Sequence, residues 1–399
     1  MKLRKLAEIN VRNKKILLRI DVNSPVVNGK ILDNPRFEAS AKTIKYLINK
    51  NAKVVVIAHQ GRKGDRDFTS LEQHAKILSN FIGRKVEYVD DLFGNVSRDK
   101  INNLNIKDVI ILRNVREYND EINIEMKGNK YREFCGLFDL YINEAFSVSH
   151  RLQGSIILPP RYLPCAIGLE FENELKALSK FENSRGKNKV FILGGSKVED
   201  YIPLFKFLKD KRNKMLCAGV LANLFLIIKG YDLGYESKWL KDNNYFSLIP
   251  KLKKIYSKYK NQIILPVDFG LLGENGKRVN ADLNEIPYDY KIYDVNEKTI
   301  ELFKDFIDKA DYIFMKGPLG FSEIDEFSYG TKKLLEYISE LTSKKNVFSI
   351  IGGGHLTTTI KKYKILNKFS YNSLSGGALI KYISGDKLLG IVALEKSRK

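Results

Sequence analysis

Polar and charged side chains follow each short apolar run in the first half of this 399-residue chain. The runs cover residues 15–23, 53–60, 108–114 and 140–146. The polar residues at or just beyond their ends are Asp21, Asn23, His59, Arg62, Asn114, Arg116, Asn143, His150 and Arg151, and Arg36 begins the first helix. Arginine grips carboxylates and phosphates through paired hydrogen bonds, so this set favours a small, multiply anionic ligand such as a phosphorylated carboxylate. The set contains no Ser–His–Asp or Cys–His combination.

Three glycine-containing stretches in the second half indicate a different chemistry. They are "ILGGSKVED" (192–200), "KGPLGFSE" (316–323) and "IGGGHLTT" (351–358). Glycines between a strand and a helix let backbone N–H groups close around a phosphate. The triplet 352–354 contains no lysine, so we predict that Lys197 supplies the positive charge. Each stretch alone fits an ordinary turn after a strand, but together they predict a nucleotide pocket.

The histidines and cysteines do not indicate a metal site. None of the four histidines has the spacing of a motif such as H-E-x-x-H, and His74, in a helical segment, is most simply a packing or surface residue. Cys135, Cys165 and Cys217 are far apart and odd in number, which argues against disulfides and zinc. We therefore expect a reduced, cytoplasmic setting.

These side chains must be positioned by strands and helices that end beside them. Further apolar runs cover 189–195, 214–220, 263–269, 311–317 and 347–353, and helical patterns cover 38–50, 70–82, 296–309 and 329–344. Continuous Val/Ile/Leu strands separated by helices are typical of parallel sheets buried on both faces. Ligands of such sheets bind beyond the carboxyl ends of the strands, where the polar residues lie. The pattern predicts an α/β fold.

The length and the 44% hydrophobic content favour two domains. A segment at 169–183 has apolar residues at helical spacing, and the polar stretch 184–189 follows it. We predict a domain boundary here, with the helix as connector. The pattern alone fits a further surface helix of a single domain equally well.

The net charge of +21 raises nucleic-acid binding as an alternative. Only 17 of the 68 basic residues are arginines, the lysines are spread along the whole chain, and no RNA-binding aromatic motif occurs. A lysine-rich solvated surface explains the charge more simply, so we do not expect a nucleic-acid partner. The longest apolar stretch, 216–228, is too short for a membrane span, and the first ten residues lack the apolar segment of a signal peptide. We therefore expect no membrane partner.

Taken in order, these motifs resemble those of phosphoglycerate kinase. They run from "RIDVNSPVVNGKILDNPR" through "AHQGR", "NVR" and "YINEAFSVSHR" to "LGGSKV", "LPVDF", "KGPLGF" and "IGGGH", and "GVLAN" and "GGGH" are most similar to the archaeal branch. The resemblance implies two Rossmann-like parallel-sheet lobes joined by a connecting helix. Residues 1–168 would bind 3-phosphoglycerate, 169–183 would form the interdomain helix, 184–384 would bind the nucleotide, and 385–399 would return to the N-terminal domain.

The resemblance also implies an activity, which is reversible phosphoryl transfer between 1,3-bisphosphoglycerate and Mg-ADP, giving 3-phosphoglycerate and ATP in glycolysis and gluconeogenesis. The implied substrate residues are Asp21, Asn23, Arg36, His59, Gln60, Gly61, Arg62, Arg116, His150 and Arg151. The implied nucleotide residues are Gly194, Gly195, Lys197, Tyr201, Glu323, Gly352, Gly353, Gly354 and His355. Arg36 and Lys197 are predicted to be catalytic. They would neutralise the transferring phosphoryl group, one from each lobe, after hinge closure.

The chain departs from the family pattern on the nucleotide side. Tyr201 replaces a second lysine, His355 replaces the acid after the glycine triplet, Lys316 replaces an Asn, Asn296 replaces a Gly, and Ser375 replaces a glycine of a second triplet. Mg²⁺ is therefore expected to be held mainly by nucleotide phosphates, with Asp200 as a candidate further ligand. Two other functions stay open: a nucleic-acid-binding protein derived from this fold, and another two-lobed kinase of a small acid. We expect a monomer, with a dimer as the alternative.

Overall fold

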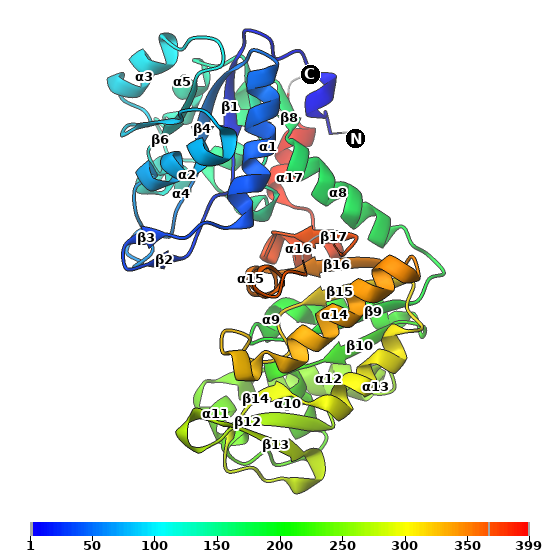
Figure 1. Ribbon diagram of the computed structural model, residues 1–399. Helices are drawn as coiled ribbons and strands as arrows, with labels where there is room; N and C mark the ends of the chain where they lie inside the picture. The colour runs from blue at the N-terminus through cyan, green and yellow to red at the C-terminus, as the bar shows by residue number, and fades with distance from the viewer. Residues whose placement is uncertain (1–2, 366–367, 398–399) are drawn as a thin grey trace. The chain divides into compact units, whose positions relative to one another are not determined.

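The structure is a computed structural model that describes residues 3–365 and 368–397. The chain forms two compact units, Met1–Lys176 with Gly385–Lys399, and Ala177–Ser384. Along the sequence it passes from the first unit to the second within helix α8 (Leu169–Glu182), and both units are α/β (Figure 1). Two parallel-sheet units linked by a helix confirm the predicted fold class.

The first unit is built on a six-stranded parallel sheet with the order β5-β6-β4-β1-β7-β8. Its strands are β1 (Lys15–Arg19), β4 (Lys53–Ile57), β5 (Glu87–Val89), β6 (Val109–Leu112), β7 (Leu140–Asn143) and β8 (Cys165–Ile167), and β2 (Val26–Val27) pairs with β3 (Lys30–Ile31) in a hairpin. The helices are α1 (Pro35–Asn49), α2 (Glu72–Ile82), α3 (Asn95–Asn102), α4 (Asn119–Ile122), α5 (Tyr131–Cys135), α6 (Gly154–Ile157), α7 (Pro159–Tyr162) and α17 (Leu389–Glu395).

The core of this unit forms because the central strands are apolar on both faces. Leu18 of β1 and Val54 of β4 are fully buried in one cluster with Phe37 and Ile44 of α1 and Leu78 of α2. Since all six strands are parallel, their carboxyl ends meet at one edge of the sheet. That edge carries the polar residues that follow β1, β4, β6 and β7.

The second unit repeats this plan with the order β11-β10-β9-β15-β16-β17. Its strands are β9 (Lys189–Leu193), β10 (Lys214–Cys217), β11 (Ile263–Ile264), β15 (Tyr312–Lys316), β16 (Phe348–Gly352) and β17 (Tyr371–Ser373). The helices are α9 (Val198–Tyr201), α10 (Gly219–Ile228), α11 (Tyr235–Asp242), α12 (Ile249–Tyr259), α13 (Glu297–Ile307), α14 (Tyr329–Lys344), α15 (Gly354–Lys362) and α16 (Gly377–Ile383).

The prediction of one strand over 263–269 is wrong. β11 ends at Ile264, and a new strand, β12 (Asp268–Leu272), begins an antiparallel sheet with β13 (Arg278–Asp282) and β14 (Lys291–Val295). Pro266 lies between β11 and β12. Proline cannot donate a ladder hydrogen bond, so the apolar run is divided there between two sheets.

Helix α8 is anchored in each unit by a different aromatic residue. The buried ring of Phe171 lies 5.2 Å from that of Phe146 in the first unit, and the ring of Phe181 lies 5.6 Å from that of Phe191 in the second. The side-chain carboxyl oxygens of Glu144 accept hydrogen bonds from the backbone N–H groups of Glu170 (3.1 Å) and Phe171 (3.3 Å). An acidic group is favoured there because the first N–H groups of a helix lack intrahelical partners.

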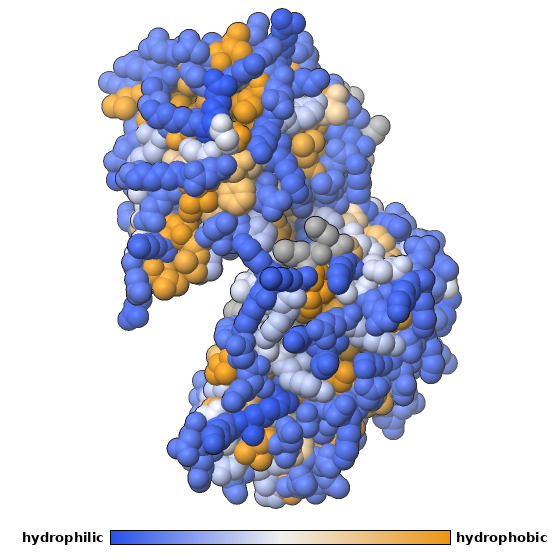
Figure 2. All heavy atoms as spheres, viewed as in Figure 1, coloured by the Kyte–Doolittle hydropathy of each residue, from blue (hydrophilic) through white to orange (hydrophobic). Residues whose placement is uncertain are grey.

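The surface is mainly hydrophilic in the view of Figure 2, as expected of a lysine-rich chain. Over residues 3–365 and 368–397, no helix combines the length and apolar content that crossing a bilayer demands. The stretch 216–228 instead forms the end of β10 and the whole of α10, and Leu221, Phe225 and Leu226 of that helix are fully buried.

Candidate functional site

Asp21, Asn23 and Arg36 form one hydrogen-bonded group beyond the end of β1. The backbone N–H of Asn23 donates to Asp21 Oδ1 (3.1 Å), and Arg36 Nη1 donates to the carbonyl of Asn23 (2.9 Å) and lies 3.5 Å from Asp21 Oδ2. Arg36 is placed by the start of α1, where Asn34 caps the helix by accepting from Arg36 N (2.9 Å) and Pro35 has the first helical position.

Burial acts to raise the pKa of the Asp21 carboxyl. Arg36 and the hydrogen bonds from Ser147 and Asn23 outweigh it and hold this pKa well below its usual value. Asp21 is therefore an anion at neutral pH and orients Arg36.

His59 follows β4, and its ring is buried. Its Nδ1 atom lies 3.1 Å from Nη2 of Arg19. A guanidinium can only donate, so His59 Nδ1 accepts and the proton of the neutral ring is on Nε2. Burial, followed by the charge of Arg19, lowers the pKa of His59 well below 6.5. His59 is thus a neutral donor at physiological pH.

Arg19 is a residue that the sequence did not single out. It is the last residue of β1, is fully buried, and donates from Nε to Ser155 Oγ (2.9 Å). Because Arg19 lies inside an apolar run, its position in the sequence does not mark it as a residue that follows a strand. Its guanidinium orients the ring of His59 by donating to Nδ1.

Both amide atoms of the Gln60 side chain are hydrogen-bonded within the protein. Its Oε1 accepts from the N–H of Ser24 (2.9 Å), and its Nε2 donates to the carbonyls of Ser24 and Asp67 (2.9 Å each). The Nε2 atom of His74, which is buried in α2, lies 3.1 Å from the same Oε1. His74 is thus a packing residue that braces Gln60, and Gln60 supports the loop between β4 and α2.

Gly61 is a position where only glycine fits. Its φ is +63°, and an added Cβ would lie 2.6 Å from the backbone nitrogen of Phe68. The N–H of Gly61 donates to Asn23 Oδ1 (2.8 Å), and its carbonyl accepts from Arg116 Nη1. The residue therefore links the loops that follow three strands.

Arg116 and Arg151 bring repelling charges together at this edge. Arg116 is buried, and among the described residues its Nη2 atom has no hydrogen-bond partner. Burial, then the charges of Arg151 and Arg19, lower the pKa of Arg116 to about 10. Burial also lowers the pKa of Arg151; Asp21 opposes this, while Arg62 and two further arginines add to it. Such a cluster gains stability from an anion.

The remaining predicted residues of this unit lie at its margin. Arg62 is exposed just beyond Gly61, and His150 is half-buried next to Arg151. Asn114 is buried and donates from Nδ2 to the carbonyls of Gln60 (2.8 Å) and Thr69 (3.0 Å). The structure thus gathers Asp21, Asn23, Arg36, His59, Arg116 and Arg151, while Gln60 and Asn114 support them.

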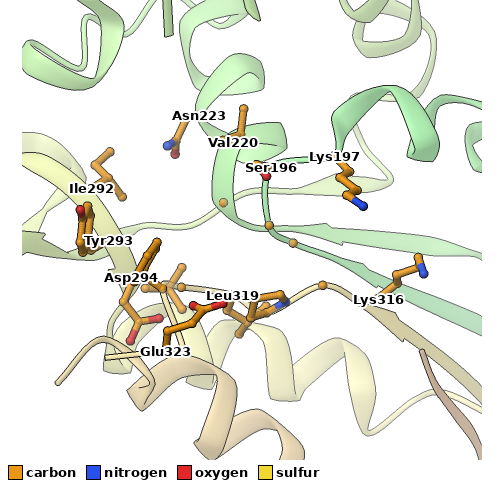
Figure 3. A pocket seen from close by; sticks show the side chains of 18 of the residues that line it. Ser196, Lys197, Val220, Asn223, Ile292, Tyr293, Asp294, Lys316, Leu319 and Glu323 are labelled. Carbon is orange, nitrogen blue, oxygen red and sulfur yellow. The ribbon is translucent and has the colours of Figure 1, made fainter. Parts of the chain in front are cut away.

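The second unit contains a pocket of about 520 Å³ at the carboxyl ends of β9, β10 and β15. Its lining includes Gly194, Gly195, Lys197, Tyr201, Glu323, Gly353 and Gly354 from the predicted nucleotide set. Lys197 and Lys316 lie at one end, and Ile292 and Tyr293 lie at the other (Figure 3). The end with the two lysines is called the charged end, and the opposite end carries aromatic and aliphatic side chains.

The charged end is built from closely packed glycines. Gly317 has a φ of +77°, and a Cβ on it would lie 2.2 Å from the carbonyl oxygen of Gly194. Gly353 (φ +116°) is the cap residue before α15, and Gly354 begins that helix. Gly352 ends β16 instead, and a Cβ on it would lie 2.4 Å from Cδ2 of Leu379.

Lys197 and Tyr201 lie at the two ends of the short helix α9. Lys197 is exposed at the cap position before the helix and lines the pocket. The hydroxyl of Tyr201 donates to the carbonyls of Gly194 (2.6 Å) and Lys316 (3.3 Å). Tyr201 thus ties the ends of β9 and β15 together. The backbone of His355 lies in the first turn of α15, but its side chain falls outside the part that the structure describes.

The opposite end also contains a cluster of aromatic, lysine and carboxylate side chains that the sequence did not indicate. Trp239 stacks on Tyr245 with ring centroids 5.7 Å apart, and Lys291 Nζ lies 3.4 Å from the centroid of Trp239. Asn223 Nδ2 donates to the buried carboxylate of Glu236 (3.0 Å), whose pKa burial raises to about 6. These residues come from α10, α11, the 3₁₀ helix Tyr245–Leu248 and β14, and no local motif links them.

No group of three or more His, Cys, Asp or Glu side chains could hold a metal ion within the described ranges 3–365 and 368–397. Asp200 is exposed on α9, close to Lys197 in sequence. Three cysteines are present as buried free thiols.

Comparison with known proteins agrees with this geometry. The family model described as phosphoglycerate kinase matches residues 6–386. The chain belongs to the phosphoglycerate kinase family. The curated phosphoglycerate kinase of Methanothermus fervidus is 39% identical over 402 residues, covering 98% of this chain and 97% of that protein. The enzyme of Archaeoglobus fulgidus is 37% identical over 399 residues, covering 98% and 96%.

Solved structures of phosphoglycerate kinases share the fold. The crystal structure of the Pyrococcus horikoshii OT3 enzyme matches with a TM-score of 0.92 at 33% identity, covering 98% of both chains. The structure from Coxiella burnetii matches with a TM-score of 0.78 at 28% identity, covering all of both chains. The predicted resemblance, including its archaeal character, is confirmed. The chain is a phosphotransferase of glycolysis with a carboxyl group as acceptor.

Proposed function

We propose that the arginine cluster of the first unit binds 3-phosphoglycerate or 1,3-bisphosphoglycerate, and that the pocket of the second unit binds Mg-ADP or Mg-ATP. The observation that carries the first assignment is the buried Arg116, with one Nη atom unpartnered among the described residues and a pKa lowered by burial and then by neighbouring arginines. A ligand with a carboxylate and a phosphate would relieve this repulsion and satisfy the orphaned donor.

The chemistry needs no general base on this site. The carboxylate of 3-phosphoglycerate is ionised at neutral pH and is already the nucleophile. Arg36 is assigned to the transferring phosphoryl group, because Asp21 and Asn23 orient its partly exposed guanidinium. His59, neutral with its proton on Nε2, would donate to an oxygen of the ligand.

The nucleotide would lie along the pocket with its phosphates at the glycine-rich end. The N–H of Gly354 lies at the first residue of α15, whose N-terminus favours negative charge, and Lys197 adds a side-chain ammonium. The base would extend over Val220 and Leu319 toward Trp239. Glu323, exposed at the rim, is assigned to the sugar.

Magnesium would arrive as part of the nucleotide. Mg²⁺ in such sites keeps several waters and takes one or two carboxylates together with substrate phosphates. Asp200 offers one exposed carboxylate near the lysine end, which supports a minor role for the protein in holding the ion. In-line transfer also requires both ligands in one place, so the proposal includes a domain closure that brings them together. The free thiols support a cytoplasmic setting.

The two-site assignment can be tested by crossed binding measurements. Arg62→Met should weaken 3-phosphoglycerate binding by about 10-fold or more, the range for losing a charged hydrogen bond, and leave Mg-ADP affinity unchanged. Val220→Phe should narrow the pocket, weaken Mg-ADP binding and leave 3-phosphoglycerate affinity unchanged. Titration calorimetry of both variants against both ligands checks this. Loss of 3-phosphoglycerate affinity only in Val220→Phe would show that the sites are reversed.

A further inference from the structure

Lys316 has an unusual position in the second unit. It is the last residue of β15 and pairs with Leu193 of β9 on one side and Gly352 of β16 on the other. Its carbonyl accepts hydrogen bonds from Gly194 N (2.9 Å) and from the hydroxyl of Tyr201 (3.3 Å). The backbone of Lys316 is therefore fixed at the meeting point of three strand ends.

The side chain of Lys316 is 7% exposed and lines the pocket. Its Nζ donates to the carbonyl of Gly376 (3.0 Å) and lies 3.8 Å from where a Cβ of Gly353 would be. Gly353 and Gly376 are the cap residues before α15 and α16. The ammonium thus lies between the two glycine-containing turns at the charged end.

The carbonyl of Gly376 is a neutral acceptor, and a phosphate oxygen forms a shorter and stronger bond with an ammonium. The four-carbon stem of lysine lets the ammonium turn toward such an oxygen without movement of the backbone. A nucleotide phosphate at Gly353 would lie beside this group.

We propose that Lys316 is a second phosphate-binding lysine of this site, which acts with Lys197 on the terminal phosphates of the nucleotide. Lys197 is exposed at the rim and Lys316 is buried at the floor, so the two would approach the phosphates from different elements. The proposal rests on the assignment of this pocket to the nucleotide. Tyr201 has a different role: its hydroxyl is bonded to backbone carbonyls and holds the ends of β9 and β15 together.

The experiment compares the affinities of adenosine, AMP, ADP and ATP for the wild type and for Lys316→Met by titration calorimetry. We expect adenosine to bind both proteins within about threefold, and ADP and ATP to lose about 10- to 100-fold in the variant, the range for a charged hydrogen bond. Lys316→Arg should recover most of the loss because it keeps the charge. The matched control is Lys291→Met, at the other end of the pocket, which should change adenosine and ADP affinity by the same factor.

Three outcomes would overturn the proposal. These are unchanged ADP affinity in Lys316→Met, an equal loss for adenosine and ADP, or a failure of Lys316→Arg to recover binding while its thermal unfolding matches that of the wild type. If Lys316→Met does not fold, the same affinities are measured for Lys316→Arg and Lys316→Gln. The proposal then requires that ADP binds more weakly to Lys316→Gln than to Lys316→Arg while adenosine binds both alike. Turnover of 3-phosphoglycerate by the wild type is measured on the same preparation. Absent turnover with a phosphate-dependent loss of binding would reject the proposed function and keep the role of Lys316.

Discussion

Replacing Arg36 with Ala should lower the turnover number far more than it changes substrate affinity. Arg36 is anchored by Asn23 O (2.9 Å) and by Asp21 Oδ2 (3.5 Å), so its guanidinium is oriented before any ligand arrives. A preorganised charge acts mostly on the charge that develops in the transition state. The loss should therefore appear in kcat.

The Arg36→Ala change should affect both the turnover number and the stability of the fold. Losing one preorganised donor costs about 10²- to 10³-fold in kcat, or roughly 3–4 kcal/mol. The attraction between Arg36 and Asp21 at 3.5 Å is about 5 kcal/mol at an effective dielectric constant of about 20, but the 26% exposure of the Arg36 side chain lets solvent reduce it. Asp21 also keeps its hydrogen bonds from Ser147 and Asn23 in the variant. The folded state should thus survive, and the catalytic effect should dominate.

The assay measures initial rates over a range of 3-phosphoglycerate concentrations at saturating Mg-ATP. Arg36→Ala should lose at least 10²-fold in kcat, and Arg36→Lys should retain part of the activity because it keeps the charge without the fork of donors. Lys42→Ala is the matched control, since Lys42 is exposed on the same helix and should have wild-type kinetics. A near-normal kcat with only a raised KM in Arg36→Ala would show that Arg36 binds the substrate and does not stabilise the transition state.

Three further predictions concern other parts of the two sites. Lys197→Met should lower turnover by about 10²-fold or more while Mg-ADP still binds, and wild-type turnover in that variant would remove Lys197 from catalysis. In the intact protein, 3-phosphoglycerate should protect segments 20–62 and 114–151 from hydrogen exchange, and protection only in 184–384 would reverse the assignment. Because the pKa of His59 is lowered in the folded state, the unfolded chain binds more protons below pH about 6.5, so stability should decline as pH falls through that value. His59→Gln should flatten this decline in urea unfolding between pH 5 and 7, and an unchanged slope would assign it to other groups.

The sequence predicted the residues whose position depends on where a strand ends. Asp21, His59 and Arg116 follow apolar runs, and parallel strands bring their carboxyl ends to one edge, so the cluster could be assembled without coordinates. The start of α1 could also be predicted from the sequence, because Asn34 is typical of a helix cap and Pro35 of a first helical residue.

Other features depend on contacts that no local pattern encodes. Arg19 lies inside an apolar run and is recognised only through its contact with His59. The edge strands β5, β8 and β17 have three residues each, too few to show a period. Trp239 and Lys291 are 52 positions apart and meet only because β14 and α11 pack together. Tertiary packing decided each of these.

A phosphoglycerate kinase transfers a phosphoryl group between ATP and the carboxylate of 3-phosphoglycerate. The most direct measurement is ADP release from ATP and Mg²⁺ by the purified protein, with and without 3-phosphoglycerate and with 2-phosphoglycerate and glycerate as alternative acceptors. We predict ADP release that depends on 3-phosphoglycerate and yields a product that glyceraldehyde-3-phosphate dehydrogenase reduces with NADH. Faster turnover with another small acid, or salt-sensitive nucleic-acid binding by a folded protein that shows no turnover, would contradict the assignment of this activity to the chain.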